Sequence, residues 1–286
     1  MRLTQSSLWS AVLAVAAASS LALAQSPSGS NAVGSISASR VATASPASKA
    51  EQTLDTAAGQ NRYTYLVFYR SDDPATRTMA QTVKDGLAKR GDKAVATYVQ
   101  VGNPAEKTLV DKYDVSRAPM PLTIVVAPNG AMTGIFAQKI EDKNLDDAQV
   151  TPTMMKCMKS LQEGKLVLIS VRNAPSTIAP AAVRDLQADP HFKDRVVNYA
   201  MQVSDPAEGK FLQQMQIEPA KLLTQQTVLL APPGVLVGKF EQTASKDEIA
   251  NALAKAGKCC DDVNCKHHQQ QAPATRTATQ DAGVRR

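Results

Sequence analysis

The chain contains one sequence pattern twice, and this duplication limits the folds open to it more than any other feature. Residues 100–106 read QVGNPAE and return as QVSDPAE at residues 202–208, an offset of 102. The turn at 128–130 returns at 232–234, an offset of 104, and a Gly-x-Phe follows each turn. At an offset of 102, Leu66, Val67 and Arg70 also correspond to Leu168, Ile169 and Arg172. Nearly one offset in three separate segments indicates two copies of one fold unit.

The spacing of apolar residues predicts the same series of elements in each copy. A continuous β-prone run is typical of a strand buried on both faces, and a proline can open an amphipathic helix. In the first copy we expect strands at 63–69 and 94–101, helices at 74–90 and 103–113, a hairpin of strands at 122–127 and 131–136, and a closing helix at 153–161. In the second we expect a strand at 166–171, a helix at 180–188, a strand at 196–203, a helix at 205–215, a hairpin at 227–240 and a helix at 246–256.

This order of elements is that of the thioredoxin core, and one stretch of the first copy resembles that family in detail. It runs from Tyr113-Asp114-Val115 through Pro121 and an apolar strand to Asn129-Gly130, and it is similar to the family's segment around its cis-proline and final hairpin. The resemblance implies an α/β fold of two tandem thioredoxin-like domains, each a mixed central sheet flanked by helices. The domains are expected at residues 58–164 and 165–257.

Neither copy has the cysteine pair that the resemblance would place after the first strand. In thioredoxins, the helix N-terminus activates the first thiol of Cys-x-x-Cys at this turn. Here the turn reads RSDDPA at 70–75, so Asp72 and Ala75 stand at the two sulfur positions, and residues 172–177 also lack cysteine. Dithiol exchange at the usual place is therefore excluded, and we expect the protein not to be an enzyme.

Asp72 and Asp73 can be interpreted in two ways. They could form a catalytic carboxylate pair, but no histidine or second polar cluster accompanies them. Acidic residues before a helix more often cap its free N–H groups and favour its dipole. We therefore favour a capping role at the edge of a binding surface.

Pro121 is the candidate cis-proline. The resemblance implies that the loop at Met120 and Pro121 presents backbone groups to an extended peptide by strand addition, which needs no cysteine. Alternatively, Pro121 or nearby Pro119 only shapes the loop. The second copy has Gln225 and Gln226 here, so it is expected to lack this feature.

The N-terminal residues predict export. Residues 1–24 combine a basic start, an apolar run and small residues before a cleavage point, as in a secretory signal peptide. Residues 25–57, rich in Ser and Ala, are expected to form a disordered leader. No membrane span is expected, and the location is predicted to be periplasmic or extracellular.

The C-terminal tail, residues 258–286, concentrates possible metal ligands. They are Cys259, Cys260, Cys265, His267 and His268. A disulfide from Cys265 to Cys259 or Cys260, a bound Zn or Cu ion, and neither of these all remain open. Cys157, among methionines on a predicted helix, is expected in the core.

The formal net charge is +6, but the basic residues are dispersed among acidic ones. No basic stripe with interleaved aromatic residues points to nucleic acid. Without a cofactor motif in the two repeats, the leading hypothesis is a redox-inactive module that binds a peptide or protein partner in the cell envelope. The alternative is a thiol-redox or metal-binding protein that uses the C-terminal cluster.

Overall fold

The computed structural model describes residues 47–174 and 178–258. The chain divides into two compact units, Met1–Gln162 and Glu163–Arg286. The predicted signal peptide, residues 25–46 of the predicted leader and the cluster from Cys259 to His268 lie outside the described residues. In the described ranges, no helix is both long and apolar enough to cross a membrane.

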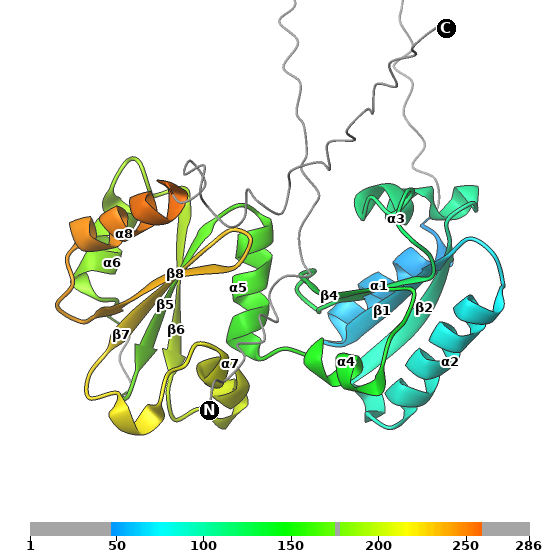
Figure 1. The fold of residues 1–286 in the computed structure, drawn as a ribbon, viewed down its shortest axis with the longest axis horizontal. Helices are drawn as coiled ribbons and strands as arrows, with labels where there is room; N and C mark the ends of the chain where they lie inside the picture. The colour runs from blue at the N-terminus through cyan, green and yellow to red at the C-terminus, as the bar shows by residue number, and fades with distance from the viewer. Residues whose placement is uncertain (1–46, 175–177, 259–286) are drawn as a thin grey trace, which may run out of the picture. The chain divides into compact units, whose positions relative to one another are not determined.

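The first unit is a four-stranded mixed sheet in the order β2-β1-β3-β4, with helices on both faces (Figure 1). Strand β1 pairs parallel with β2 and antiparallel with β3, which pairs antiparallel with β4. The elements are α1 (Lys49–Gly59), β1 (Tyr63–Tyr69), α2 (Pro74–Ala88), β2 (Ala94–Gln100), α3 (Lys107–Lys112), β3 (Leu122–Val126), β4 (Met132–Ala137), α4 (Asp142–Asp147) and α5 (Pro152–Gln162), with short 3-10 helices at Gly91–Lys93 and Pro104–Glu106.

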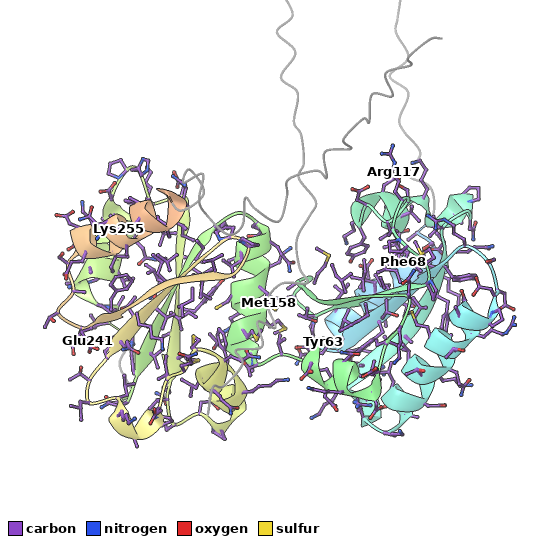
Figure 2. The ribbon with its side chains drawn as sticks, in the orientation of Figure 1. Tyr63, Phe68, Arg117, Met158, Glu241 and Lys255 are labelled. Atoms are coloured by element: carbon purple, nitrogen blue, oxygen red, sulfur yellow. The ribbon has the colours of Figure 1, made fainter. Side chains whose placement is uncertain are left out.

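Strand β1 is buried on both faces, as its apolar run predicted. Successive side chains of a strand point to opposite faces, so Leu66 and Phe68 pack with α1 and α3. Tyr65 and Val67 pack on the other face with α2 and α4. Figure 2 shows Phe68 inside the unit. The sheet therefore separates two cores.

The prediction of a disordered leader up to residue 57 is wrong for residues 49–57, which belong to α1. Ser48 and Glu51 form a reciprocal capping box at the start of this helix. Ala50 and Leu54 are buried against the sheet. Because small residues allow close packing at helical spacing, an Ala-rich segment with one leucine is sufficient here, although its composition resembles that of a linker.

The second unit repeats this architecture with the strand order β6-β5-β7-β8. Leu166 and Leu168 of β5 pack with residues of α6 and α8, as the matching face of β1 packs with α2 and α4. Its elements are β5 (Leu166–Arg172), α6 (Ala181–Ala188), β6 (Val196–Gln202), α7 (Gly209–Gln214), β7 (Gln226–Ala231), β8 (Val235–Glu241) and α8 (Lys246–Lys258), with 3-10 helices at Pro206–Glu208 and Pro219–Lys221.

The structure corrects which helix closes the first copy. Helix α4 follows β4 and contacts α2, just as α8 follows β8 and contacts α6. The predicted closing helix at 153–161 is α5, which precedes β5 in the chain as α1 precedes β1. Each copy in chain order is therefore helix, strand, helix, strand, helix, hairpin, helix. Six-residue α4 was missed because its sequence DKNLDD carries too little apolar periodicity.

The structure also shifts the match between the first strands by one residue. Tyr63 pairs with Ala94 where Leu166 pairs with Val196. Likewise, the carbonyl of Tyr69 accepts from the Val101 N–H, and that of Arg172 accepts from the Val203 N–H. Arg172 thus matches Tyr69 rather than Arg70, and its side chain is 4% exposed. A shift of one residue reverses the face of every side chain in a strand, so only pairing identifies the correct register.

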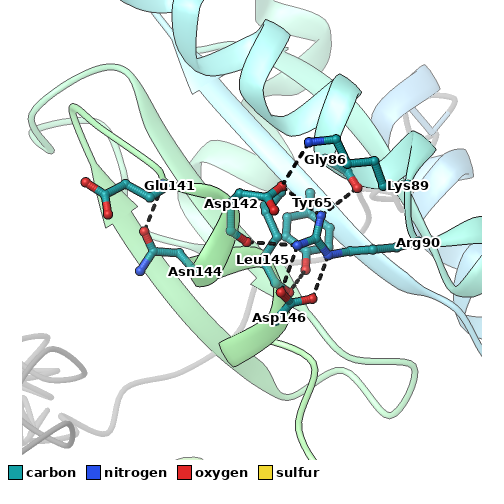
Figure 3. A network of polar contacts seen from close by, with 9 residues as sticks. All are labelled: Tyr65, Gly86, Lys89, Arg90, Glu141, Asp142, Asn144, Leu145 and Asp146. Atoms are coloured by element: carbon teal, nitrogen blue, oxygen red, sulfur yellow. Dashed lines mark hydrogen bonds and ion pairs between the residues drawn. The ribbon is translucent and has the colours of Figure 1, made fainter.

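A polar network ties α4 to the end of α2 (Figure 3). The Arg90 guanidinium donates to the Gly86 carbonyl at 2.7 Å, to Asp142 Oδ1 at 3.0 Å and to Asp146 Oδ1 at 2.7 Å. The Tyr65 hydroxyl donates to the Leu145 carbonyl at 2.7 Å. These bonds satisfy polar groups at both helix ends and hold α4 over the sheet.

Candidate functional site

The N-terminus of α2 lies where a thioredoxin carries its thiols, and here Asp73 caps it. The Asp73 carboxylate accepts from the Thr76 N–H at 2.8 Å and from the Ser71 hydroxyl at 3.0 Å. These bonds hold the pKa of Asp73 below its usual value, the bond from Thr76 being the largest cause. Asp73 therefore acts as a helix cap in its ionised form.

Asp72 is not paired with Asp73 as an acid–base couple. Its carboxylate lies 3.4 Å from the Arg77 guanidinium, and both side chains are exposed. Exposed ion pairs of this kind contribute little to stability. The two carboxylates thus have separate partners. The capping interpretation holds for Asp73, whereas Asp72 forms a surface ion pair instead of a cap.

In the part of the chain that the structure describes, no thiol lies at this helix end. The one cysteine among the described residues is Cys157, which is buried in α5, as its methionine-rich surroundings predicted. In the same part of the chain, no group of three or more His, Cys, Asp or Glu side chains could hold a metal ion. The five predicted tail ligands lie outside the described residues, so the Zn or Cu hypothesis stays a prediction.

The loop before β3 contains the candidate peptide-binding residues. The Met120–Pro121 peptide bond is cis. Pro121 is buried and its carbonyl accepts from the Gln138 N–H at 2.7 Å, which anchors the loop to the segment after β4. Met120 packs its side chain against the core between the sheet and α1. Within residues 47–174 and 178–258, neither its N–H nor its carbonyl has a hydrogen-bond partner.

Arg70 connects this loop to the end of β1. Its guanidinium donates to the Ser116 carbonyl at 2.8 Å, while Arg117 projects outward from the same loop (Figure 2). The Arg70–Ser116 bond could not be predicted from local sequence, because the two residues lie 46 positions apart. The bond fixes the loop relative to the turn that contains Asp72 and Asp73.

The second unit has a side-chain bond equivalent to the Arg70–Ser116 bond, but the loop that it anchors has a different sequence. The Asn173 side-chain amide donates to the carbonyls of Leu222 and Leu223, at 3.3 Å and 2.8 Å. Asn173 occupies the position of Arg70 in the corrected register. The cis bond found in this unit joins Pro232 to Pro233 in the β7–β8 turn, not the residues beside Gln225.

Two open grooves lie near these elements. One of about 310 Å³ lies between α2 and residues 138–140, and Pro74, Met79 and Lys139 are part of its lining. The other, of about 400 Å³, lies in the second unit between the segment that follows β6 and residues 216–219. Met120, Pro121, Asp72 and Asp73 line neither of these two grooves.

No protein-family model matches the sequence. No curated protein matches it either.

Solved structures that resemble the chain include thioredoxins and proteins with several thioredoxin domains. The thioredoxin Deadhead of Drosophila melanogaster is 21% identical over 39% of this chain and 95% of its own, with a TM-score of 0.28. The first two thioredoxin domains of Eps1p from Naumovozyma dairenensis are 12% identical over 74% of this chain and 97% of theirs, with a TM-score of 0.25. Human ERp44 in a zinc-bound form is 13% identical over 71% of this chain and 58% of its own, with a TM-score of 0.31.

The sheet topology assigns the fold independently of these similarities. In both units the first strand pairs parallel with the second and antiparallel with the third, and a hairpin and a helix complete the unit. Helices cover both sides of the first sheet, and α6 and α8 pack together on one side of the second. The chain therefore contains two tandem units, each with the strand order and pairing of the thioredoxin-like fold.

Proposed function

We propose that this protein is an exported, redox-inactive thioredoxin-like module that binds an extended segment of a peptide or protein partner in the cell envelope. The observation that carries the proposal is the free backbone of Met120. Its N–H and carbonyl have no hydrogen-bond partner in the described part of the chain, directly before β3. An extended peptide can satisfy both groups by strand addition.

The surroundings of Met120 support binding rather than thiol chemistry. The Pro121 carbonyl is already bonded to Gln138, and Arg70 holds the loop at Ser116. Both contacts preorganise the loop and so lower the entropic cost of docking. The neighbouring helix end offers the Asp73 carboxylate instead of a nucleophilic sulfur.

The test uses the full chain labelled with ¹⁵N and a short peptide of alternating valine and threonine with a lysine at each end. We expect the peptide to shift the Met120 amide resonance. Met120→Pro, which lacks the N–H donor, should weaken binding at this loop by about fivefold, because a lost hydrogen bond costs about 1 kcal/mol. Met120→Leu is the matched control, since it keeps the backbone donor and a similar apolar side chain.

Two results would contradict the proposal. One is an unchanged Met120 amide at saturating peptide; the other is equal binding by Met120→Pro and wild type. A peptide methylated at its central amide nitrogen gives a check that needs no change in the protein, and it should bind less well than the unmethylated peptide.

The C-terminal cluster leads to a separate test of the alternative. Alkylation of the native protein followed by mass measurement should leave buried Cys157 unlabelled. A tail disulfide would protect two of the three cysteines at 259, 260 and 265, and a bound metal would protect them until a chelator is added. Labelling of all three without a chelator would exclude both hypotheses.

A further inference from the structure

The two units differ at the outer edge of their sheets. Strand β4 ends the first sheet and β8 ends the second. The pairing has the same irregularity in both: the register shifts between Val125 and Val126 opposite β4, and between Leu229 and Leu230 opposite β8. Beyond the shift, Met132 pairs with Val126 and Leu236 pairs with Leu230. Met132 and Leu236 are therefore equivalent edge positions.

In the first unit this edge is occupied by a side-chain amide. Gln162 of α5 accepts from the Met132 N–H at 2.9 Å and donates to the Met132 carbonyl at 2.7 Å. Asn129 adds a bond from its side-chain amide to the Met155 carbonyl at 2.9 Å. A carboxamide has the donor and acceptor of a peptide group, so Gln162 pairs with β4 as one residue of a neighbouring strand would.

In the second unit, no residue of the described ranges covers the same edge. Ala131 is 0% exposed beside β4, whereas its counterpart Val235 is 52% exposed. Leu236 is 44% exposed. Among the described residues, no side chain bonds to the backbone of Leu236 as Gln162 bonds to Met132. Outward-facing backbone groups flanked by apolar side chains are a template for a further strand.

The charges that usually guard an edge strand are engaged elsewhere. Lys239 of β8 is half-buried, and its amine donates to the Gln216 carbonyl at 3.0 Å. Glu241 accepts from the Gln226 side chain at 3.4 Å. Natural edge strands often avoid added strands by projecting lysine into solvent, and β8 has no such free lysine.

We infer that the β8 edge, centred on Leu236, is a second docking site, and that its ligand is an extended apolar segment of another protein. The Gln162 amide on the equivalent residue indicates that the ligand is a peptide group, and the exposed Val235 and Leu236 favour apolar side chains beside it. This site lies in a different unit from Met120 and does not depend on the function proposed for that loop.

The test uses the ¹⁵N-labelled full chain and the same valine–threonine peptide. We expect the peptide to shift the Leu236 amide. Leu236→Lys should weaken binding at this edge by about tenfold or more, since it places a charge on an exposed edge. Leu223→Lys is the matched control, because Leu223 is 86% exposed and lies outside β8, and it should change binding less than about twofold.

A gain-of-site variant tests the equivalence of the two edges. Gln162→Ala frees the N–H and carbonyl of Met132, so the Met132 amide should begin to respond to the peptide. Because the Met120 amide is observed in the same spectra, failure at Leu236 and failure at Met120 are distinguished. If neither the Leu236 amide in wild type nor the Met132 amide in the variant responds, the inference is wrong.

Other occupants of the edge would also overturn the inference. A concentration-dependent dimer that Leu236→Lys abolishes would assign the edge to a second copy of the chain. A Leu236 amide protected from solvent exchange in the monomer before peptide is added would assign it to another part of the same chain. Equal loss of binding in Leu236→Lys and Leu223→Lys would show that the effect is not specific to β8.

Discussion

Gly86 shows how one residue sets the distance between two elements. It lies in α2 and faces the fully buried Leu145 of α4, and a Cβ added there would overlap the Leu145 Cδ1 atom (Figure 3). Glycine inside a helix normally costs about 1 kcal/mol relative to alanine. Its presence here is explained by the close approach of α4, which leaves no room for a methyl group.

We expect Gly86→Ala to lower the free energy of unfolding by about 1–2 kcal/mol, because overpacking outweighs the gain in helix propensity. Gly209→Ala is the control, since a Cβ there meets no atom within 4 Å and its helical backbone suits alanine. Urea unfolding of the two variants measures the difference. A Gly86→Ala protein as stable as wild type would show that α2 and α4 are not closely packed.

The stability that Asp73 contributes to the fold should depend on pH. Because the pKa of Asp73 is lowered in the fold, its contribution is present above the pKa of the unfolded carboxyl, near 4, and is lost as the pH falls through the folded value. Asp73→Ala should therefore destabilise the protein at about pH 7 and have a smaller effect at about pH 2. An equal effect at both pH values in urea unfolding would rule out the charged cap.

The first sheet needs helices on both faces. On the face covered by α2 and α4, α4 is the shorter helix. A six-residue helix is marginal by itself, so its place depends on tertiary contacts. Arg90 supplies these tertiary contacts, and its side chain is only 12% exposed. The pKa of Arg90 is raised, mainly by its hydrogen bonds to Asp146 and Asp142. One guanidinium therefore joins the last turn of α2 to two turns of α4.

Arg90→Lys should lower the stability of the first unit by about 1 kcal/mol, because an ammonium cannot reproduce the forked contacts and its two carboxylate partners are largely exposed. Lys89→Ala is the comparison, as that amine is 69% exposed and 3.9 Å from Asp142. Thermal unfolding should separate them. Equal decreases in the unfolding temperature of the two variants would mean that the Arg90 network stabilises the fold no more than an exposed charge does.

Two tyrosines of the first unit, the buried Tyr65 and the half-buried Tyr113, make the protein sensitive to alkali. Burial raises the pKa of Tyr65 to about 12, and its hydroxyl donates to the Leu145 carbonyl. Burial also raises the pKa of Tyr113 to about 12. An unfolded tyrosine ionises near pH 10, so stability that is full below about pH 10 is lost as the pH rises toward about 12.

We therefore expect the urea midpoint to fall between about pH 9 and about pH 11.5, with tyrosinate absorbance rising together with unfolding. In Tyr65→Phe the urea midpoint should fall less over this pH range, because the variant lacks one of the two hydroxyls whose pKa is raised to about 12. The variant also lacks the hydrogen bond to the Leu145 carbonyl. The difference in tyrosinate absorbance between the wild type and Tyr65→Phe isolates the Tyr65 ring. If this difference appears near pH 10 while both proteins are still folded, Tyr65 ionises in the fold and the prediction is wrong.

Much of the fold could be predicted from local sequence, and the misses have a common cause. Strand β1 was predicted at its exact bounds because an apolar run between turn residues determines a buried strand directly. Helices α1 and α4 were missed because each owes its place to distant partners: the sheet buries Leu54, and Arg90 holds Asp142. The candidate site could be predicted only in part. The absence of cysteines from the first turn is visible in the sequence. The unpaired N–H and carbonyl of Met120 are visible only in the folded structure, where the residues around Met120 are known.

The duplication, the order of most elements and the absence of the cysteine pair can be read from the amino-acid sequence, since each depends on residue identity or spacing along the chain. Three features became visible in the fold alone: Arg172 matches Tyr69, α4 closes the first copy, and Gln162 covers one sheet edge while no described residue covers the other edge at Leu236. Strand register, helix docking and edge pairing are contacts between distant residues, so no local pattern encodes them. Two copies with nearly the same local pattern can therefore differ in the surfaces they present.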